Sequence, residues 1–280
     1  MQYSNPQIPE GINTSTEHPL KEFVLLTGGV LAVVVVVVLL LGYFADTFSN
    51  RIPFKFEQSL ANDRFNKETS APQMEAYLNQ LAGKLAAAQK LPGDMNITVH
   101  YVDEDRVNAF ATLGGNVIMF RGLLEKLPNE NALAMVLAHE IAHINHRDPI
   151  RSIGRGVVIG LALSMVSATL GNAVTDQVLS GGGMLTVLHY SRDQESAADE
   201  MALEALRAHY GHVNGATDLF EILEAAHAGL PQAEFFSSHP LTQKRIERIR
   251  EVAATLRTAK APELQPLPPD FAAWMKSEAK

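Results

Sequence analysis

The hydrophobic residues of this 280-residue chain gather most densely near its N-terminus. Phe23 to Ala45 is a run of 23 residues without a charge, and as a helix it can cross the ~30 Å hydrocarbon core of a bilayer. A cleaved signal peptide is the alternative, but residues 1–22 carry Glu10, Glu17 and Glu22 rather than a basic start, and the run is too long. We therefore predict one uncleaved transmembrane helix at 23–45, after a Pro-rich disordered tail at 1–22.

After this run the hydrophobic positions follow first a helical period and then an alternating one. Gln73–Lys90 repeats its apolar residues at helical spacing, whereas Met95–Val102 alternates them with polar ones. A short strand from Asn108, a turn at Gly114-Gly115 and a strand through Val117–Met119 follow. This order predicts one helix and a small antiparallel sheet.

Three later segments again have the helical period. They are Asn131–His146, Ser191–Tyr210 and Leu241–Arg257. Because helices outnumber strands, we predict an α+β, predominantly helical domain at 73–257. Residues 46–72 are expected to link this domain to the transmembrane helix, and the Pro-rich tail at 258–280 is expected to dock on it through Phe271 and Trp274.

A second apolar stretch, Val157 to Leu170, must be weighed as another membrane span. A single crossing here would put the residues before and after it on opposite sides of the bilayer. A return crossing would have to come from Thr175–His189, which is too short and too polar. We therefore expect a helix that packs within the domain or lies on the bilayer surface.

Composition excludes several classes of site. The formal net charge is −8 and the Lys and Arg residues do not cluster, which argues against nucleic acid as a partner because phosphate binding needs a basic patch. The chain contains no cysteine, so disulfides, thiolate metal sites and cysteine nucleophiles are excluded.

The sequence His139-Glu140-Ile141-Ala142-His143 is a candidate metal site. Two histidines four positions apart lie on one face of a helix, where both can bind one metal ion. Glu140 beside them could take a proton from a water activated by that metal, as in zinc peptidases. With ten histidines in the chain, such a motif arises by chance in roughly a few per cent of cases, so it needs support from elsewhere.

Glu195 and Asp199 offer that support. They are four positions apart on one helix face, and alanines beside them would let another helix approach closely. A solvated acidic face is the alternative, which this pair alone leaves open.

With two further stretches, these motifs make the chain resemble the M48 family of zinc metallopeptidases, as a membrane-anchored member. The stretches occur in the family's order and span about Gln73 to Arg257. They are Asn108–Ala111 with Gly114–Ile118 and Arg121–Leu124, His139–His143, Glu195–Asp199, and His239-Pro240 with Arg245-Ile246.

The resemblance implies a zincin-like fold and one Zn²⁺ per chain. The metal would be bound by His139, His143 and Glu195, with a further position left open for catalysis. Asp199 would orient a ligand histidine. Glu140 would be the general base that activates water and returns its proton to the leaving amine.

The resemblance also assigns roles outside the metal ligands. His239 would stabilise the oxyanion, although a loop histidine that caps the next helix is the alternative, and Arg245 would tie its helix to the site. The strand at Asn116–Met119 would be an edge that receives an extended substrate by main-chain pairing. The substrate-binding residues would then be Asn108, Gly115, Asn116, Val117 and Ile118.

The function implied is a membrane-anchored, zinc-dependent endopeptidase that cuts unfolded or membrane-associated proteins in quality control. Its partners would be protein or peptide substrates and the lipid bilayer. The alternatives are a non-catalytic chaperone or assembly factor that keeps the fold, and a zinc hydrolase of small peptides or lipids. The intact ligand set and Glu140 argue against a scaffold, which needs no general base.

The side of the membrane is weakly specified. Because it has one span, the chain is similar to the branch of the family whose protease domain is essentially soluble, which implies an inner-membrane anchor with a periplasmic domain. The charges around the span, Lys21 before it and Arg51 and Lys55 after it, favour instead a cytoplasmic domain.

Overall fold

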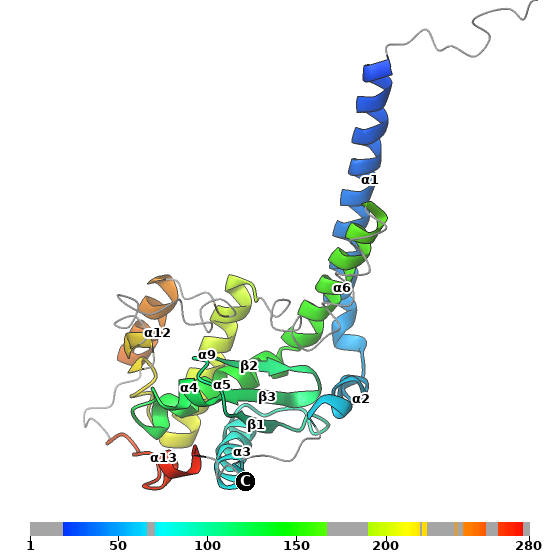
Figure 1. The fold of residues 1–280 in the computed structure, drawn as a ribbon. Coiled ribbons are helices and arrows are strands. Elements are labelled where there is room, and N and C mark those ends of the chain that lie inside the picture. The colour runs from blue at the N-terminus through cyan, green and yellow to red at the C-terminus, as the bar shows by residue number, and fades with distance from the viewer. Residues whose placement is uncertain are drawn as a thin grey trace, which may run out of the picture.

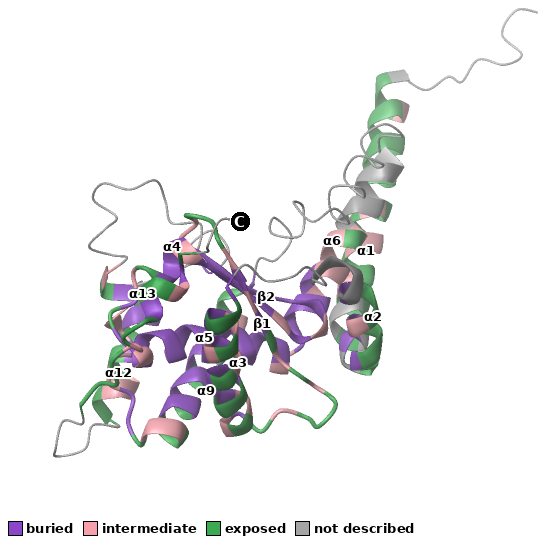
Figure 2. Ribbon diagram, turned by 60° about the horizontal axis from the view of Figure 1, so that its bottom comes forward, coloured by how far each residue is buried: buried purple, intermediate pink, exposed green. Residues whose placement is uncertain are grey.

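One long helix stands out from a folded body in the computed structural model (Figure 1). The structure describes residues 19–65, 71–166, 190–218, 220–222, 239, 243–255 and 263–276, so most of the expected N-terminal tail lies outside the described residues. Within α1 (Pro19–Phe48), Leu20–Phe44 is long and apolar enough to cross a membrane, and its side chains are exposed (Figure 2). No other helix in the described part of the chain is long and apolar enough to cross a membrane, as the hydrophobic pattern predicted.

The sheet contains β1 (Thr98–Val102), β2 (Ala109–Thr112) and β3 (Asn116–Phe120). Its strand order is β1-β3-β2, with β2 antiparallel and β1 parallel to β3. The expected hairpin of β2 and β3 is present, but the sheet is mixed instead of wholly antiparallel. Alternation along a strand determines which face is buried and does not specify the strand's neighbour, so the parallel pairing of β1 could not be inferred.

The β2–β3 connection depends on two glycines. It forms the short helix η2 (Leu113–Gly115), in which Gly114 has a φ of 72° and Gly115 a φ of 83°. A Cβ atom on Gly115 would lie only 1.9 Å from the carbonyl oxygen of Asn96. Glycine is required here both for its backbone conformation and for the close approach.

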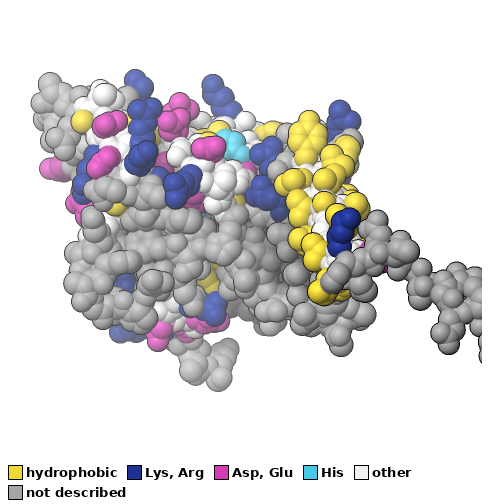
Figure 3. Space-filling model, turned by 90° about the horizontal axis from the view of Figure 1, so that it is seen from above, with side chains coloured by type: hydrophobic (Ala, Val, Ile, Leu, Met, Phe, Trp, Pro, Cys, Tyr) yellow, Lys and Arg dark blue, Asp and Glu magenta, His cyan; other side chains and the backbone are white. Residues whose placement is uncertain are grey.

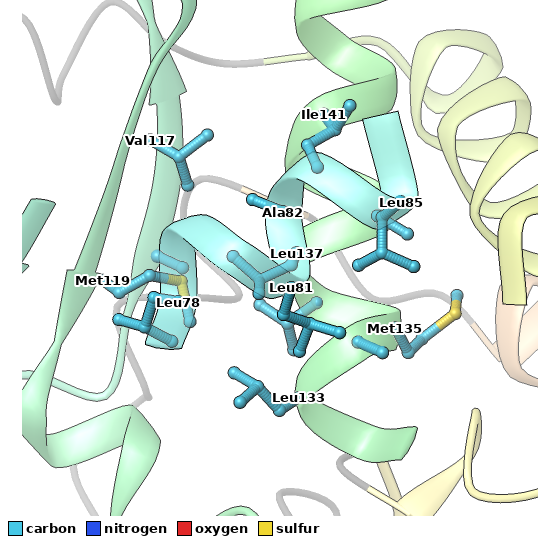
Figure 4. Close-up of a cluster of buried hydrophobic side chains, with 14 of the residues drawn as sticks. Leu78, Leu81, Ala82, Leu85, Val117, Met119, Leu133, Met135, Leu137 and Ile141 are labelled. Atoms are coloured by element: carbon cyan, nitrogen blue, oxygen red, sulfur yellow. The ribbon is translucent and has the colours of Figure 1, made fainter. Parts of the chain in front are cut away.

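The core lies where α3 (Pro72–Ala88), α5 (Glu130–Asn145) and the sheet pack against one another (Figure 4). Leu78 lies against Met119 of the sheet, and Leu81 lies near Leu137 of α5. Burying each of these leucines contributes roughly 1.5–3 kcal/mol relative to exposure.

α5 is buried for nearly its whole length, because α9 (Arg192–Tyr210) covers another of its faces. Asn129 caps its N-terminus by accepting a hydrogen bond from the Ala132 N–H at 2.8 Å. α9 begins with a capping box at Ser191 and ends at Gly211, which confirms the bounds expected from the sequence. The site residues on α5 and α9 are therefore held on two rigid, adjacent helices.

The C-terminal residues 263–276 form a strap across the start of α5. The Gln265 carbonyl accepts from the Glu130 N–H at 2.9 Å, and the Tyr101 hydroxyl donates to the Met275 carbonyl at 2.8 Å. In α13 (Phe271–Trp274), Phe271 is buried and its ring centre lies 5.9 Å from that of Tyr77. The expected docking of this tail is confirmed for the described residues.

Two segments differ from an expected placement. The described part of the second apolar stretch belongs to α6 (Asp148–Val166), which leaves the body and packs along α1 instead of within the domain (Figure 1). Its placement on a bilayer surface stays a prediction. Residues 46–72, expected as a linker, contain η1 (Ser49–Arg51) and α2 (Phe54–Phe65), which pack on the domain with Phe54 buried. The last long helix, α12 (Gln243–Thr255), packs on α9.

Candidate metal centre

Three histidines and one glutamate converge in the interior of the domain. One potential ligand atom from each of His139, His143, Glu195 and His239 lies within 4.8 Å of all the others, and all four residues are buried. α5 supplies two of them, α9 supplies Glu195, and His239 comes from the segment before α12. Residues up to 100 positions apart along the chain thus form one cluster.

The distances within this cluster fit a zinc ion. The Nε2 atoms of His139 and His143 are 3.1 Å apart, and they lie 3.5 and 3.4 Å from oxygens of Glu195. Ligand atoms about 2.0–2.2 Å from a tetrahedral Zn²⁺ are separated by roughly 3.3–3.5 Å. Nitrogen and carboxylate donors without thiolates are also a set that zinc accepts.

Two aspartates hold the opposite sides of the imidazole rings. Oδ1 of Asp199 lies 3.0 Å from Nδ1 of His139, and Oδ2 of Asp148 lies 2.9 Å from Nδ1 of His143. An acceptor at Nδ1 fixes the tautomer and turns Nε2 toward the centre. Gln194 donates from Nε2 to Oδ1 of Asp148, which connects the start of α9 to the same carboxylate.

The charges in the cluster shift one another's proton affinities. Burial lowers the pKa of His139, but hydrogen bonds with Asp199 and Glu195 outweigh burial and raise it to about 10. Burial likewise opposes the charged form of His143, whose pKa is raised by Asp148 and Glu195. Burial favours protonation of Glu195, but the neighbouring histidines hold its pKa far below the usual range. Without metal, protons on the imidazoles therefore balance the carboxylates.

Arg245 joins α12 to both carboxylates of α9. Its Nε and Nη2 atoms donate to the two oxygens of Asp199 at 2.7 and 2.8 Å, and Nη1 lies 2.6 Å from Oε2 of Glu195. The arginine is buried, and a bidentate pair of this kind fixes the geometry of both partners. Arg245 thus lies where it can orient two residues of the site.

Glu140 is placed between the metal ligands and the sheet. Its Oε2 accepts from the Ala111 N–H of β2 at 2.7 Å, and its Oε1 lies 3.3 Å from Nε2 of His239. The side chain is fully buried. One carboxylate oxygen is therefore held by the strand, and the other faces the cluster.

His239 lies within the ligand set as well as beside Glu140. Its Nδ1 is 3.0 Å from Oε1 of Glu195 and 3.3 Å from Nε2 of His139. These distances suit a fourth ligand as well as the expected oxyanion donor. Its sequence neighbours 238 and 240 lie outside the described residues.

The strand expected to receive substrate is in the wrong place for that role. β3 is the central strand and is paired on both sides, so it offers no edge to an added strand. Val117, Ile118 and Gly115 are buried, Asn108 pairs with Phe120 through its carbonyl, and the Asn116 amide donates to the Leu113 carbonyl. The expectation was wrong because the strand order, which could not be inferred from the sequence, places β3 in the middle of the sheet.

Two residues of the site escaped the sequence analysis. Asp148 was assigned no role, yet an acid just after α5, the helix that carries His139 and His143 (the metal helix), is a signal, because a ligand histidine needs an acceptor at Nδ1. Tyr190 stacks on the His143 ring, with ring centres 3.9 Å apart, and its hydroxyl donates to the Ala111 carbonyl at 3.4 Å. Burial raises its pKa well above the usual value, so it is a neutral donor. No sequence signal marks it.

Comparison with known proteins gives several related proteases. The chain is 29% identical over 214 residues to the mitochondrial metalloendopeptidase OMA1 of Schizosaccharomyces pombe, covering 72% of this chain and 62% of the relative. It is 27% identical over 201 residues to the beta-barrel assembly-enhancing protease of Escherichia coli K12, covering 66% and 40%. The chain thus spans less than two thirds of either relative. It is also 27% identical over 257 residues to a protease HtpX homolog of Ralstonia pickettii, covering 77% and 84%.

The family assignment rests on a longer match. The model of peptidase family M48 matches residues 72–253, which are more than half of the chain and include all four members of the metal cluster. The sequence motifs, the buried ligand set and this match agree, and the chain belongs to peptidase family M48.

Proposed function

We propose that this protein is a zinc-dependent endopeptidase that hydrolyses peptide bonds of unfolded or membrane-associated proteins. The observation that carries the proposal is the position of Glu140. Its carboxylate touches the backbone of a strand at one oxygen and approaches the metal cluster at the other. A protein that only used zinc to hold its fold would not need a buried carboxylate beside the ligands, because burying a charge is costly.

His139, His143 and Glu195 are proposed to hold the zinc, with a fourth position left open for substrate and water. When bound, zinc supplies a Lewis acid that polarises the peptide carbonyl and lowers the pKa of water. Four protein ligands would close the site, whereas catalytic zinc sites keep a position open. We therefore keep His239 as a donor to the oxyanion.

In the proposed reaction Glu140 moves one proton. Its Oε1 takes a proton from the attacking water, whose oxygen bonds to the peptide carbonyl carbon. His239 donates a hydrogen bond to the negative carbonyl oxygen. As the C–N bond breaks, Glu140 gives the proton to the leaving amine. Asp199 and Arg245 keep Glu195 and His139 in place during these steps.

We propose that the substrate pairs with the outer edge of β2, beside Ala111, whose N–H and carbonyl are held by Glu140 and Tyr190. In the antiparallel β2–β3 pair, Asn108 bonds to β3, so Ala109 and Ala111 direct their backbone groups away from it. The Ala111 N–H donates to Glu140 there. Main-chain pairing at this edge accepts an extended chain with little regard to sequence, as suits a protease for unfolded proteins.

We propose that α1 anchors the domain to the inner membrane by a single span, with the domain on the periplasmic side. Hydrophobic side chains cover α1 where it projects from the body (Figure 3). Its anchor would bring the site close to membrane-associated substrates in protein quality control. Digestion of the domain by protease added to spheroplasts would support this side, and protection until the membrane is lysed would place the domain in the cytoplasm.

Digestion of casein tests the catalytic proposal. The full chain should digest casein, lose activity with a chelator, and regain it on addition of zinc. Glu140→Gln should bind zinc with the same stoichiometry, one per chain, yet lower kcat/KM by roughly 10³-fold or more, because the base is lost. Wild-type activity in Glu140→Gln would exclude the mechanism. Zinc binding without any proteolysis by the wild type would favour a non-catalytic chaperone.

A further inference from the structure

The segment between α1 and the peptidase domain is buried against the domain and is not a simple tether. η1 and α2 place Ser49, Phe54 and Glu57 in contact with the body, and each is at most 3% exposed. A tether has no reason to bury a carboxylate, because a buried charge needs a partner. The partner of Glu57 lies at the end of the metal helix.

Arg147 is that partner. Its Nη2 lies 2.5 Å from Oε1 of Glu57 and donates to the Ile52 carbonyl at 2.7 Å. Its guanidinium carbon lies 5.6 Å from the ring centre of Phe54. The segment therefore encloses one side chain from the end of the metal helix.

The backbone of Arg147 shows that its position matters. Its φ is 63°, in the left-handed region that disfavours side chains with a Cβ, and glycine is the usual residue just after a helix. An arginine in this strained position is explained by the contacts of its guanidinium group. The next residue is Asp148, whose carboxylate holds Nδ1 of His143. Where Arg147 is held thus determines where Asp148 lies.

A second contact reaches the same carboxylate. Arg151 donates from Nε to the Ser49 hydroxyl at 3.1 Å, and its Nη1 lies 3.6 Å from Oδ1 of Asp148. The segment is thus joined to the metal ligand through two separate arginines.

The other side of α2 supports the strand beside Glu140. Oε2 of Glu57 accepts from the Gly114 N–H at 3.5 Å, and a Cβ on Gly114 would lie 2.9 Å from Cα of Gln58. Gly114 belongs to the turn that ends β2, the strand of Ala111. The short helix α2 therefore contacts both the turn that follows the metal helix and the turn that follows β2.

We propose that Ser49–Ala61, the juxtamembrane segment, is a positioning element of the metal centre. Glu57, Arg147 and Arg151 are its positioning residues, and they act on zinc through Asp148 and His143. This inference rests on the proposed zinc site. It makes the end of the membrane-crossing helix and the metal ligand parts of one rigid unit.

The experiment follows the loss of zinc from the full chain in detergent micelles. Zinc-loaded protein is mixed with excess 4-(2-pyridylazo)resorcinol, and the rate of metal transfer is read from its absorbance at 25 °C. The variants are Glu57→Gln, Arg147→Gly and Arg147→Lys. Lys55→Gln is the control, because Lys55 lies exposed on the same helix. Thermal unfolding of each metal-free protein is measured in parallel.

Glu57→Gln and Arg147→Gly should lose zinc at least about threefold faster than wild type, a smaller effect than the roughly 10–100-fold of a residue that touches a ligand directly. Arg147→Gly should unfold at a lower temperature than wild type, because it leaves the Glu57 carboxylate buried without its cation, although glycine suits the backbone conformation at this position. Arg147→Lys keeps the charge and should lose zinc at a rate between those of wild type and Arg147→Gly. Lys55→Gln should lose zinc at the wild-type rate.

Wild-type rates of zinc loss in both Glu57→Gln and Arg147→Gly would overturn the inference. If Arg147→Gly does not fold, the rate of zinc loss is compared in Glu57→Gln and Ser49→Ala instead. Wild-type rates in both of these variants would then overturn the inference. A wild-type chain that binds no zinc would instead refute the proposed function, so the two failures are distinguishable.

Discussion

Oδ2 of Asp148 lies 2.9 Å from Nδ1 of His143, across the turn that ends the metal helix. The carboxylate is almost fully buried and also accepts from Gln194 at the start of α9. The two helices that supply the proposed metal ligands are therefore joined by one aspartate, five residues after the second histidine. Its pKa is lowered by His143 and Gln194 against the effect of burial, so it is the ionised acceptor.

Asp148→Asn should weaken zinc binding about 10–100-fold, the usual effect of removing the acceptor behind a ligand histidine. An amide can donate to Nδ1 and so favour the wrong tautomer of His143. Competition with a chelator of known affinity measures the change. Asp193→Asn, at an exposed site on the same first turn of α9, should have no effect, and equal affinities in both variants would refute the role of Asp148.

Paired alanine variants separate the roles of Glu195 and His239. Glu195→Ala should lower the zinc content well below one per chain, because a ligand is lost. His239→Ala should retain zinc and reduce kcat for casein by roughly 10²–10³-fold, as expected for a donor to the oxyanion. Zinc content is measured by elemental analysis after dialysis. Loss of zinc from His239→Ala would make His239 a fourth ligand.

Arg245→Met should destabilise the folded protein by about 3–5 kcal/mol, because it leaves two buried carboxylates without their cation. Chemical denaturation of the metal-free protein measures the loss. Arg248→Met is the matched control on the same helix. Arg248 is 59% exposed in its pair with Glu200, so its loss should cost no more than about 1 kcal/mol. Similar losses in both variants would contradict a special role for Arg245.

Zinc affinity should fall as the pH falls. In the metal-free fold, burial is outweighed by Asp199 and Glu195, and the pKa of His139 rises from 6.5 to about 10. Zinc must displace this proton, so affinity should increase between pH 6.5 and 9 by up to about tenfold per unit for one proton. A pH-independent affinity would show that the site binds zinc without releasing a proton.

The raised pKa of His139 also predicts that the metal-free fold becomes less stable as the pH rises. A raised pKa contributes stability that is fully present below 6.5 and is lost as the pH rises through about 10. The metal-free protein should therefore unfold at a lower temperature at pH 9.5 than at pH 7. His139→Gln should lack this part of the pH dependence, and an unchanged dependence in that variant would assign it to other groups.

Ala111→Pro should lower kcat for casein by at least about tenfold, because proline removes the N–H that holds Glu140. Proline is otherwise tolerated at sheet edges, so the fold should persist. Ala111→Gly keeps the N–H and is the control. Circular dichroism checks the fold of each variant, and equal kcat values in folded Pro and Gly variants would exclude the contact from catalysis.

The long helices were predictable because their apolar faces repeat over many turns. α3, α5 and α9 begin and end within two residues of the expected bounds. β1 could not be placed, because its parallel partner lies beyond β2 in sequence and alternation does not encode pairing. α2 was taken for a linker because charges interrupt its apolar residues, and only the structure shows that Arg147 neutralises its buried glutamate.

The site was predictable where spacing along one helix determines proximity. His139 with His143, and Glu195 with Asp199, are such pairs. Asp148 lies beyond a turn whose direction depends on the left-handed backbone of Arg147, which no helical period describes. Strand order likewise decided that β2, and not β3, lies at an edge of the sheet.

His139 and His239 lie 3.3 Å apart although 100 positions separate them in the chain. At about 5–20 residues per second, a ribosome needs roughly 5–20 s to make the second histidine after the first. Arg245 and the C-terminal strap are synthesised later still. For that interval, a chain that is still being translated carries α5 without the residues that complete the site.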